Sequence, residues 1–320
     1  MKIEAQKARE LGGVRGGQDA AFQEGLSALH SDRRNVALVD IAATFGVMAG
    51  VIYLLARYPG PWSYALAFVG IGLMQYRIVV ACHEAVHKAL LYPLWLNESV
   101  GSIHCALVGI NLLWYRYQHL WHHAARDVGH DPDAYIYEPI LRARPGIRRL
   151  ARWIFGTGAE AIEKLRQKGF TVSATLEADG TARMYSLAIV AVQGMLLLLC
   201  TVWLSWWYYF AFWLAPLLTI AIFVNRTRVF VEHGYAHRAR PEGTDLTAVP
   251  VGAIDLSATL LERFFIAPYM IHYHFAHHRM PSIPYHRISD LSRLLEQRGE
   301  AASAVRCPSY SQALRHLLWN

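Results

Sequence analysis

The sequence predicts an all-α integral membrane protein whose four transmembrane helices form two hairpins. The first observation is composition, because 54% of the 320 residues are hydrophobic and the mean hydropathy is +0.19, both high for a soluble protein of this length. The second is a set of paired apolar stretches, each about long enough to cross a hydrocarbon core of roughly 30 Å. The third is a series of histidine clusters whose spacing of three and four residues places their side chains on one face of a helix.

The apolar stretches fall into two pairs, each joined by a short turn. The first pair covers about residues 35–56 and 62–82, and a tight turn at residues 57–61 separates them. The second pair covers about residues 184–204 and 206–224, and the turn between them is rich in Trp and Tyr. Such aromatic residues are typical of a membrane interface, so we expect two transmembrane hairpins.

A third apolar stretch, Ser99–Trp114, lies between the two hairpins. It is short and carries His104 and Asn111, which favours a re-entrant or interfacial segment over a full crossing. With no crossing here, an even number of spans separates the histidine clusters, and all of them lie on one side of the membrane. We therefore expect a single domain, residues 1–320, with a helical cap formed by residues 83–183 and 225–320 that holds the histidines.

Basic residues indicate how the chain is oriented. They gather before the first span and between the hairpins, which are the regions expected on the cytoplasmic side. They are Lys2, Lys7, Arg9, Arg33, Arg34, Arg142, Arg144, Arg148, Arg149, Arg152, Lys164, Arg166 and Lys168. The sequence thus predicts that both termini and the histidine clusters lie on the cytoplasmic side of a membrane. We expect this membrane to be a bacterial inner membrane. The formal charge of +7 then reflects orientation and contact with anionic lipid, and we expect no nucleic-acid partner.

The start of the chain and the first span carry two further indications. The first ten residues are charged and lack the apolar core of a signal peptide, so we expect the first span to be an uncleaved helix. Asp40 is an ionisable residue inside that span, where a charge is costly. Because it lies near the cytoplasmic end, we expect it to reach back to the interface or to pair with Arg33 or Arg34.

Eight histidines form three clusters that can enclose metal. A single catalytic zinc needs only about three protein ligands, so three clusters indicate two transition-metal ions. The clusters are His83 and His87 in H-E-A-V-H, His119, His122 and His123 in H-L-W-H-H, and His274, His277 and His278 in H-F-A-H-H. The spacing therefore predicts a dimetal centre.

These clusters resemble the histidine boxes of the integral-membrane fatty acid desaturase superfamily, whose members carry H-x3-H or H-x4-H followed by two boxes of the form H-x2-H-H or H-x3-H-H. Residues 127–133 read D-V-G-H-D-P-D, similar to the D-P-D that often follows the second box. Residues 274–286 read H-F-A-H-H-R-M-P-S-I-P-Y-H, similar to the family ending H-x2-H-H-x2-P-x-I-P-x-H. V-E-H-G at residues 231–234 resembles the segment that supplies one further ligand. The resemblance thus nominates His233 as a ninth ligand, with His237 one turn later as the alternative.

The resemblance implies a non-haem centre of two Fe ions that uses O2 and two electrons to attack an unactivated C–H bond. Introduction of a double bond into a fatty acyl or acyl-lipid chain is the expected reaction. Hydroxylase or ketolase chemistry on the same scaffold, acting on a lipid or a small metabolite, is the alternative. Carboxylates often orient ligating imidazoles, although an acid near a helix end can equally be a solvated cap or an ion-pair partner. The candidates for such supporting roles are Glu84, Asp131, Asp133, Glu232 and His237.

The source of electrons must be a separate protein. The sequence has neither the haem motif of a fused cytochrome b5 nor a dinucleotide-binding fingerprint, and its four cysteines form no C-x2-C pair. We therefore expect a ferredoxin, rubredoxin or cytochrome b5 type donor with its reductase, besides membrane lipids and the substrate. The basic stretch at residues 142–152 could dock that donor or lie on lipid headgroups, and we favour lipid.

Two interpretations from other classes stay open. H-E-A-V-H alone matches H-E-x-x-H, in which two histidines bind zinc and Glu84 acts as the base of a metallopeptidase. A metal-storage or metal-transport protein also clusters histidines, but along a transmembrane path. His272 lies two residues from His274, off the predicted ligand face, so we expect a hydrogen-bonding or surface role for it.

Overall fold

The computed structural model describes residues 20–160, 162, 180–237, 251–300 and 309–320. Regular structure in these residues is helical, and the one extended pairing is an isolated bridge between Asp255 and Tyr273. The all-α prediction is confirmed for this part of the chain.

Among the described residues, four helices are long and apolar enough to cross a membrane, as predicted. They are Ala37–Arg57 (α2), Pro61–Val86 (α3), Gly180–Trp203 (α10) and Trp206–His237. The fourth comprises α11 (Trp206–Tyr209), η2 (Phe210–Leu214), η3 (Leu217–Ala221) and α12 (Ile222–His237), where η2 and η3 are π-helical. The helices α3 and α12 continue past the ends of the apolar stretches at residues 82 and 224. Hydropathy falls there, but backbone hydrogen bonding does not need apolar side chains.

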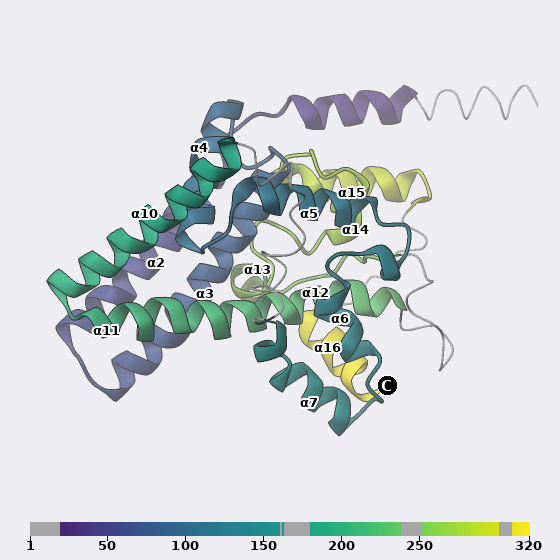
Figure 1. Cartoon of the computed structure of the whole chain (residues 1–320). Coiled ribbons are helices and arrows are strands. Elements are labelled where there is room, and N and C mark those ends of the chain that lie inside the picture. The colour runs from purple at the N-terminus through teal and green to yellow at the C-terminus, as the bar shows by residue number, and fades with distance from the viewer. Residues whose placement is uncertain (1–19, 161, 163–179, 238–250, 301–308) are drawn as a thin grey trace, which may run out of the picture.

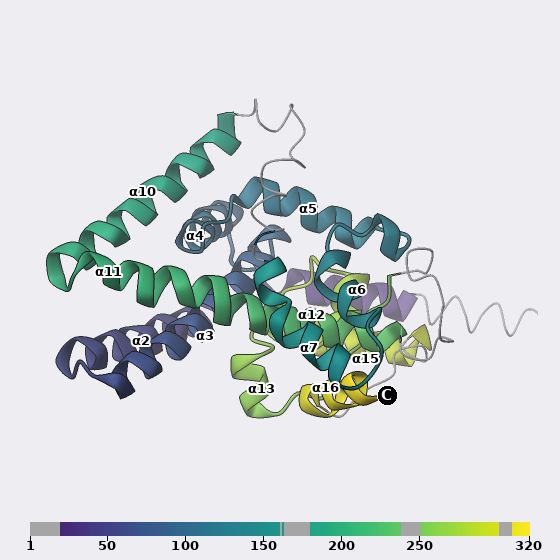
Figure 2. The same ribbon diagram turned by 60° about the horizontal axis from the view of Figure 1, so that its bottom comes forward.

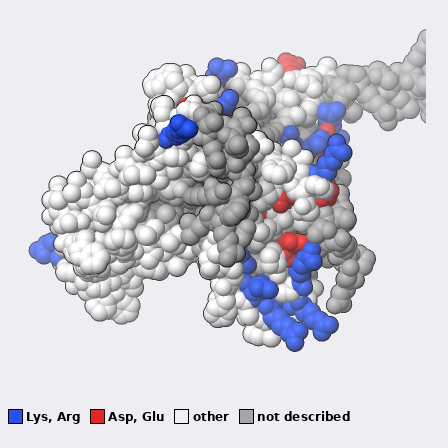
Figure 3. Space-filling model, in the orientation of Figure 1, with Lys and Arg blue, Asp and Glu red and all other residues white. Residues whose placement is uncertain are grey.

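The spanning helices project from one side of the molecule (Figure 1), and the view in Figure 2 shows the same arrangement. Helix α2 packs along α3, and α10 packs on the short helix α4 (Leu94–Leu107). On the face shown in Figure 3, the projecting half is almost free of Lys, Arg, Asp and Glu, while charged residues gather over the other half. Large apolar side chains of α10 are exposed, with Leu187 68% and Val190 70% accessible. Such a surface suits a lipid environment, and the chain is a membrane protein.

The stretch Ser99–Trp114 is divided between two helices. Helix α4 has 14 residues, too short to cross a bilayer, and α5 (Leu112–Ala124) follows after a turn that contains Gly109 at φ 68°. Asn111 caps α5, because its side chain accepts hydrogen bonds from the backbone N–H groups of Leu113 and Trp114. Its amide also donates to Ala182 O, 2.8 Å away on α10. Asn111 is therefore the N-cap of α5, and its side chain also connects α5 to α10.

The remaining helices form the other half of the molecule. Helix α12 packs against both α6 and α16, and α14 packs against α15. A helix at residues 20–31 contributes Phe22 and Leu29 to a small core with Leu291 and Leu295 of α15. The elements are η1 (Val128–His130), α6 (Ala134–Leu141), α7 (Ile147–Phe155), α13 (Leu260–Phe265), α14 (His274–Arg279), η5 (Tyr285–Arg287), α15 (Ile288–Gln297) and α16 (Tyr310–Trp319).

The predicted partner of Asp40 was wrong. Asp40 Oδ1 accepts a hydrogen bond of 3.0 Å from Arg77 of α3, and Asp40 Oδ2 accepts one of 2.7 Å from the Tyr285 hydroxyl. Arg34 instead forms an ion pair with Asp32. Spacing along the chain favoured a local partner, but the α2–α3 hairpin places Arg77 opposite Asp40. This ion pair, in which Arg77 is buried and Asp40 is partly exposed, therefore joins the first two spans to the segment that follows α14.

Candidate metal centre

Helix ends deliver the clustered histidines to one place. Helix α3 carries His83 in its last turn and ends just before His87, and both side chains are buried. Helix α5 carries the second cluster near its C-terminus, α12 carries His233, and α14 is formed largely by the third cluster. Because α3 and α12 continue beyond their apolar stretches, their histidines lie at the ends of the spanning helices.

Asp255 fixes the short helix that carries the third cluster. Its Oδ1 accepts the backbone N–H groups of Phe275 at 2.8 Å and Ala276 at 3.2 Å, which are orphan donors of the first turn of α14. Its Oδ2 accepts the Ser292 hydroxyl at 2.7 Å, so α15 holds the carboxylate in place. Nothing in the spacing of the sequence pointed to Asp255, because it lies 19 residues before His274 in a segment without a helical pattern.

The ring nitrogens of all nine nominated histidines converge in two groups. Within each group the nitrogens that could bind a metal lie within 4.8 Å of one another. The first group is His83, His87, His119, His123 and His277, and the second is His122, His233, His274 and His278. The second and third clusters each contribute to both groups, which separations along the sequence could not reveal. Their role as ligands stays a prediction.

The nitrogen positions fit two metal ions. Two nitrogens bonded to one ion at about 2.1 Å and at right angles lie about 3.0 Å apart. His119 Nε2 and His123 Nε2 are 3.0 Å apart in the first group, and His274 Nε2 lies 3.0 Å from His233 Nε2 in the second. Among the described residues, the buried Nε2 atoms of His83, His87 and His277 have no hydrogen-bond partner. Buried lone pairs directed at a common point are expected where a metal binds.

Carboxylates lie on the far side of several of these rings. Glu84 Oε1 is 3.0 Å from His83 Nδ1, and Asp131 Oδ1 is 2.6 Å from His122 Nδ1. Glu232 Oε2 is 3.5 Å from His274 Nδ1. A carboxylate at Nδ1 accepts its proton and leaves the Nε2 lone pair available to a metal. Asp133 behaves differently, because it accepts a hydrogen bond of 3.0 Å from Gln118 Nε2.

The structure separates His233 from His237. His233 Nδ1 donates to the carbonyl oxygen of Gly252 at 2.7 Å, which directs its Nε2 toward His274. His237 is buried beside Tyr137 with the two ring centroids 6.4 Å apart, and it belongs to neither group. Gly252 was not visible as a partner in the sequence, since a backbone carbonyl leaves no residue signature.

Burial keeps the histidines outside the spans neutral near pH 7. It lowers the pKa of His87 to about 3 and that of His123 to about 2, and the pKa values of His119, His277 and His278 also fall well below the usual range. Burial alone would likewise lower the pKa of His122, but the Asp131 carboxylate outweighs it and raises this pKa. Neutral imidazole is the metal-binding form, so the rings with a lowered pKa, unlike His122, need not lose a proton to bind.

A second polar network supports the second group from behind. Glu232 Oε2 accepts a hydrogen bond from Arg228, and Glu232 Oε1 accepts one of 2.5 Å from the Tyr310 hydroxyl of α16. Tyr137 of α6 donates to Asp131 Oδ2 at 2.7 Å. Neither tyrosine was nominated from the sequence. Each immobilises a carboxylate that in turn faces an imidazole.

The expected surface or hydrogen-bonding role of His272 was wrong. Its side chain is only 1% exposed, and neither ring nitrogen has a hydrogen-bond partner among the described residues. It belongs to neither histidine group. His272 is a packed residue whose backbone carbonyl accepts the Leu256 N–H at 2.8 Å.

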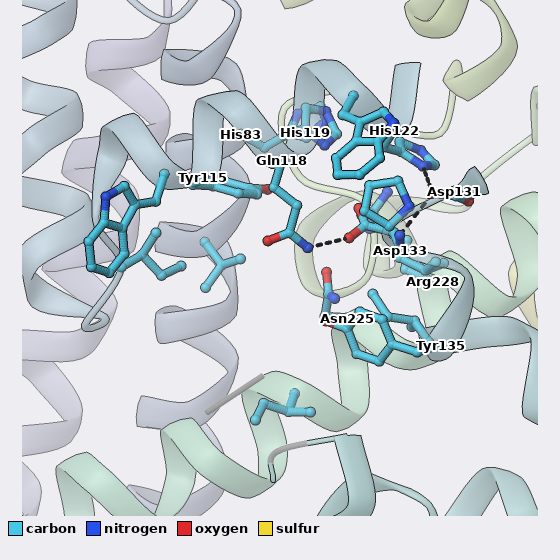
Figure 4. A pocket seen from close by; sticks show the side chains of 18 of the residues that line it. His83, Tyr115, Gln118, His119, His122, Asp131, Asp133, Tyr135, Asn225 and Arg228 are labelled. Carbon is cyan, nitrogen blue, oxygen red and sulfur yellow. Dashed lines mark hydrogen bonds and ion pairs between the residues drawn. The ribbon is translucent and has the colours of Figure 1, made fainter. Parts of the chain in front are cut away.

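A cavity of about 460 Å³ reaches both histidine groups (Figure 4). His83 and His119 of the first group line it, as do His122, His233 and His274 of the second. Apolar residues of α3, α5 and η3 form one part of its wall, and Gln118, Asp133, Asn225 and Arg228 form another. Its size is within the usual range for small-molecule sites, so a substrate can reach the histidines.

Asp131→Asn tests the support of His122. The variant keeps the shape of the side chain but removes the charge that holds the His122 N–H, so metal affinity should fall by about 10- to 100-fold. Chelator competition on purified protein, followed by elemental analysis, measures this affinity. Glu138→Gln removes a carboxylate that faces Arg142 on the outside of α6 and serves as the control. Equal metal retention by both variants would contradict the assignment.

Comparison with known proteins adds one match. The sequence model of the fatty acid desaturase family matches residues 59–309, which include all nine histidines and three of the four candidate spans from end to end. No curated protein matches the chain. The chain therefore belongs to the fatty acid desaturase family, and this membership implies a membrane oxidoreductase of the desaturase or hydroxylase type.

Proposed function

We propose that the protein is an O2-dependent oxidoreductase that holds two Fe ions and introduces a double bond into a fatty acyl or acyl-lipid chain. The observation that carries the proposal is the division of nine histidines into groups of five and four, beside one cavity. Two groups built from all three boxes suit two ions better than one. Imidazole is a good ligand for iron, and the fatty acid desaturase match supports this chemistry.

When bound, two iron ions would supply the activation of O2 and the two-electron redox step that side chains alone cannot provide. The residues of the chain do the rest. The nine imidazoles would fix the ions, and Glu84 and Asp131 would keep the Nδ1 protons of His83 and His122 turned away from them. The largely apolar lining of the cavity would disfavour water beside the reacting carbon.

Hydroxylation is the alternative within the same class. The two outcomes differ in whether a second hydrogen is removed or oxygen is returned to the carbon, and small displacements of the substrate decide between them. Both share the histidine groups and the cavity, so product analysis distinguishes them.

The zinc-peptidase alternative loses support at Glu84. A metallopeptidase needs this glutamate to face the water on zinc. Here Glu84 is 2% exposed and bonded to its neighbour His83, while His119, His123 and His277 join His83 and His87. The storage and transport alternative needs ligands spread along a path, whereas these nine converge at one end of the spans.

We further propose that the histidine groups face the cytoplasm of a bacterial inner membrane and receive electrons from a separate donor with its reductase. The basic residues support the orientation, although Lys2, Lys7, Arg9, Lys164, Arg166 and Lys168 lie outside the described residues. Helix α7 has no buried residue and exposes Phe155 together with Arg148 and Arg152. Its mixture of basic and large apolar side chains suits lipid headgroups, so the donor is expected to dock elsewhere.

Metal analysis combined with labelled oxygen tests the proposal. Purified protein should contain about two irons per chain. Membranes that hold it, supplied with a reductant, should yield dehydrogenated lipid without ¹⁸O from ¹⁸O2, whereas incorporation of one ¹⁸O atom would indicate hydroxylation. About one zinc per chain, with no iron after anaerobic reconstitution, would refute the proposal and restore the peptidase.

A further inference from the structure

The side chains that line the cavity change in character along the two helices that form its walls. On α5, the cavity-lining residues Trp114, Gln118 and His122 are four residues apart and share one face. Going from Trp114 to His122, the wall therefore changes from apolar to polar to metal-binding. Each of these steps is about 6 Å along a helix.

The opposite wall also passes from an apolar residue to a polar one and ends at a histidine, although Val229 lies between the last two. Asn225, Val229 and His233 share one face of α12, and η3 places Leu218 before them. The amide of Asn225 points toward Gln118 and Asp133 across the cavity (Figure 4). A belt of three polar residues, Gln118, Asp133 and Asn225, hereafter the polar belt, thus separates an apolar arm from the histidine groups.

The polar belt offers hydrogen-bond acceptors beside the amide of Asn225. Gln118 Nε2 donates to Asp133 Oδ1 at 3.0 Å, which leaves Gln118 Oε1 for another partner. A carboxylate accepts several hydrogen bonds, so Asp133 can take a further donor beside Gln118. The cation that lines the same cavity, Arg228, is directed to Glu232. The belt is therefore matched to a group that donates hydrogen bonds.

A plain hydrocarbon chain does not suit this wall. Placing methylene groups against the polar belt would strip water from an amide and a carboxylate without replacing their hydrogen bonds, which is costly. A substrate that carries its own polar group there avoids the cost, and its hydrocarbon part can occupy the arm formed by Trp114, Leu217, Leu218 and Ala221.

We infer that the substrate is an amphiphile whose hydroxyl or amine group binds the polar belt, so that oxidation occurs close to this group rather than in the middle of a long acyl chain. The place of the reacting carbon rests on the proposed oxidation, whereas the binding preference does not. The ammonium or hydroxyl hydrogen would bond to Asp133 and Gln118, and charge assistance at Asp133 would favour an amine.

Binding of matched probes tests the inference without turnover. Radiolabelled dodecylamine, 1-dodecanol, dodecanoate and dodecane share a chain length, and their binding to the full-length protein in nanodiscs can be measured after subtraction of empty nanodiscs. Dodecylamine and 1-dodecanol should bind roughly 10- to 100-fold more tightly than dodecane. The double variant Gln118→Leu/Asp133→Asn should abolish this preference by weakening the binding of dodecylamine and 1-dodecanol, while dodecane should bind equally well or more tightly because less polar surface is desolvated.

Controls separate the arm from the polar belt. Trp114→Ala should weaken all four probes to a similar extent, because it removes apolar wall only. Equal binding of the four probes, or a preference that survives the double variant, would overturn the inference and make the belt a solvated rim. Tighter binding of dodecanoate than of dodecylamine would also overturn the inference, since this result would indicate a positively charged group at the polar belt. If the proposed oxidation were wrong, metal analysis would find zinc or product analysis would find no oxidised lipid. The binding preference among the four probes would not change.

Discussion

Replacing His83, His122 or His277 with alanine is expected to remove metal and abolish oxidation together. His83 and His277 belong to the first group and His122 to the second. Each variant should lower the iron content from about two per chain to about one or less, because each removes a ligand from one ion. Product formation should fall below detection in all three, since both ions are needed for the reaction. Elemental analysis and lipid product analysis on the same preparation measure the two effects.

His272→Ala is the matched control for the third cluster. His272 is as buried as His274 and lies two residues away, but it belongs to neither group. Its replacement should cost stability through an unfilled volume while leaving the iron content near that of the parent protein. Full iron content in His277→Ala, or equal iron loss in His272→Ala, would refute the assignment of the third cluster.

Asp40→Ala is expected to produce the largest loss of stability outside the histidine groups. Arg77 is 1% exposed and bonds to Asp40, to Thr44 Oγ1 at 2.9 Å and to the backbone carbonyl of Phe264 at 2.7 Å. Without Asp40 its charge stays buried with neutral partners only. The free energy of unfolding should fall by about 3 kcal/mol, near the lower end for a broken buried pair. Denaturant titration in mild detergent measures it.

Two further variants identify the cause of this loss. The double variant Asp40→Leu/Arg77→Leu should be more stable than Asp40→Leu alone, because it leaves no uncompensated buried charge. Glu138→Ala, which breaks the exposed pair with Arg142, should change the free energy of unfolding by less than about 1 kcal/mol. A double variant less stable than Asp40→Leu would show that the polar bonds of Arg77, rather than its unpaired charge, carry the effect.

Hydropathy and spacing predicted the elements that depend on local sequence. Four apolar stretches of sufficient length identify four spans, because backbone groups in lipid must be satisfied within each segment. Helical spacing in H-L-W-H-H predicts a shared direction for its histidines, since that direction follows from the geometry of one helix. Hydropathy did not indicate how far the helices continue. Helix α12 runs through Arg226 and Arg228 to His237, where the residues are no longer apolar.

The sequence by itself therefore determined the membrane class, the four spans and the eight clustered histidines, all of which follow from residue type at short range, while the resemblance nominated His233 as the ninth. Only the tertiary structure decided how these histidines divide into groups of five and four, that Asp40 faces Arg77, and that Asp255, Tyr137 and Tyr310 hold the surrounding carboxylates and helices. These contacts join residues far apart in the chain. They depend on how the helices pack, which no short-range pattern encodes.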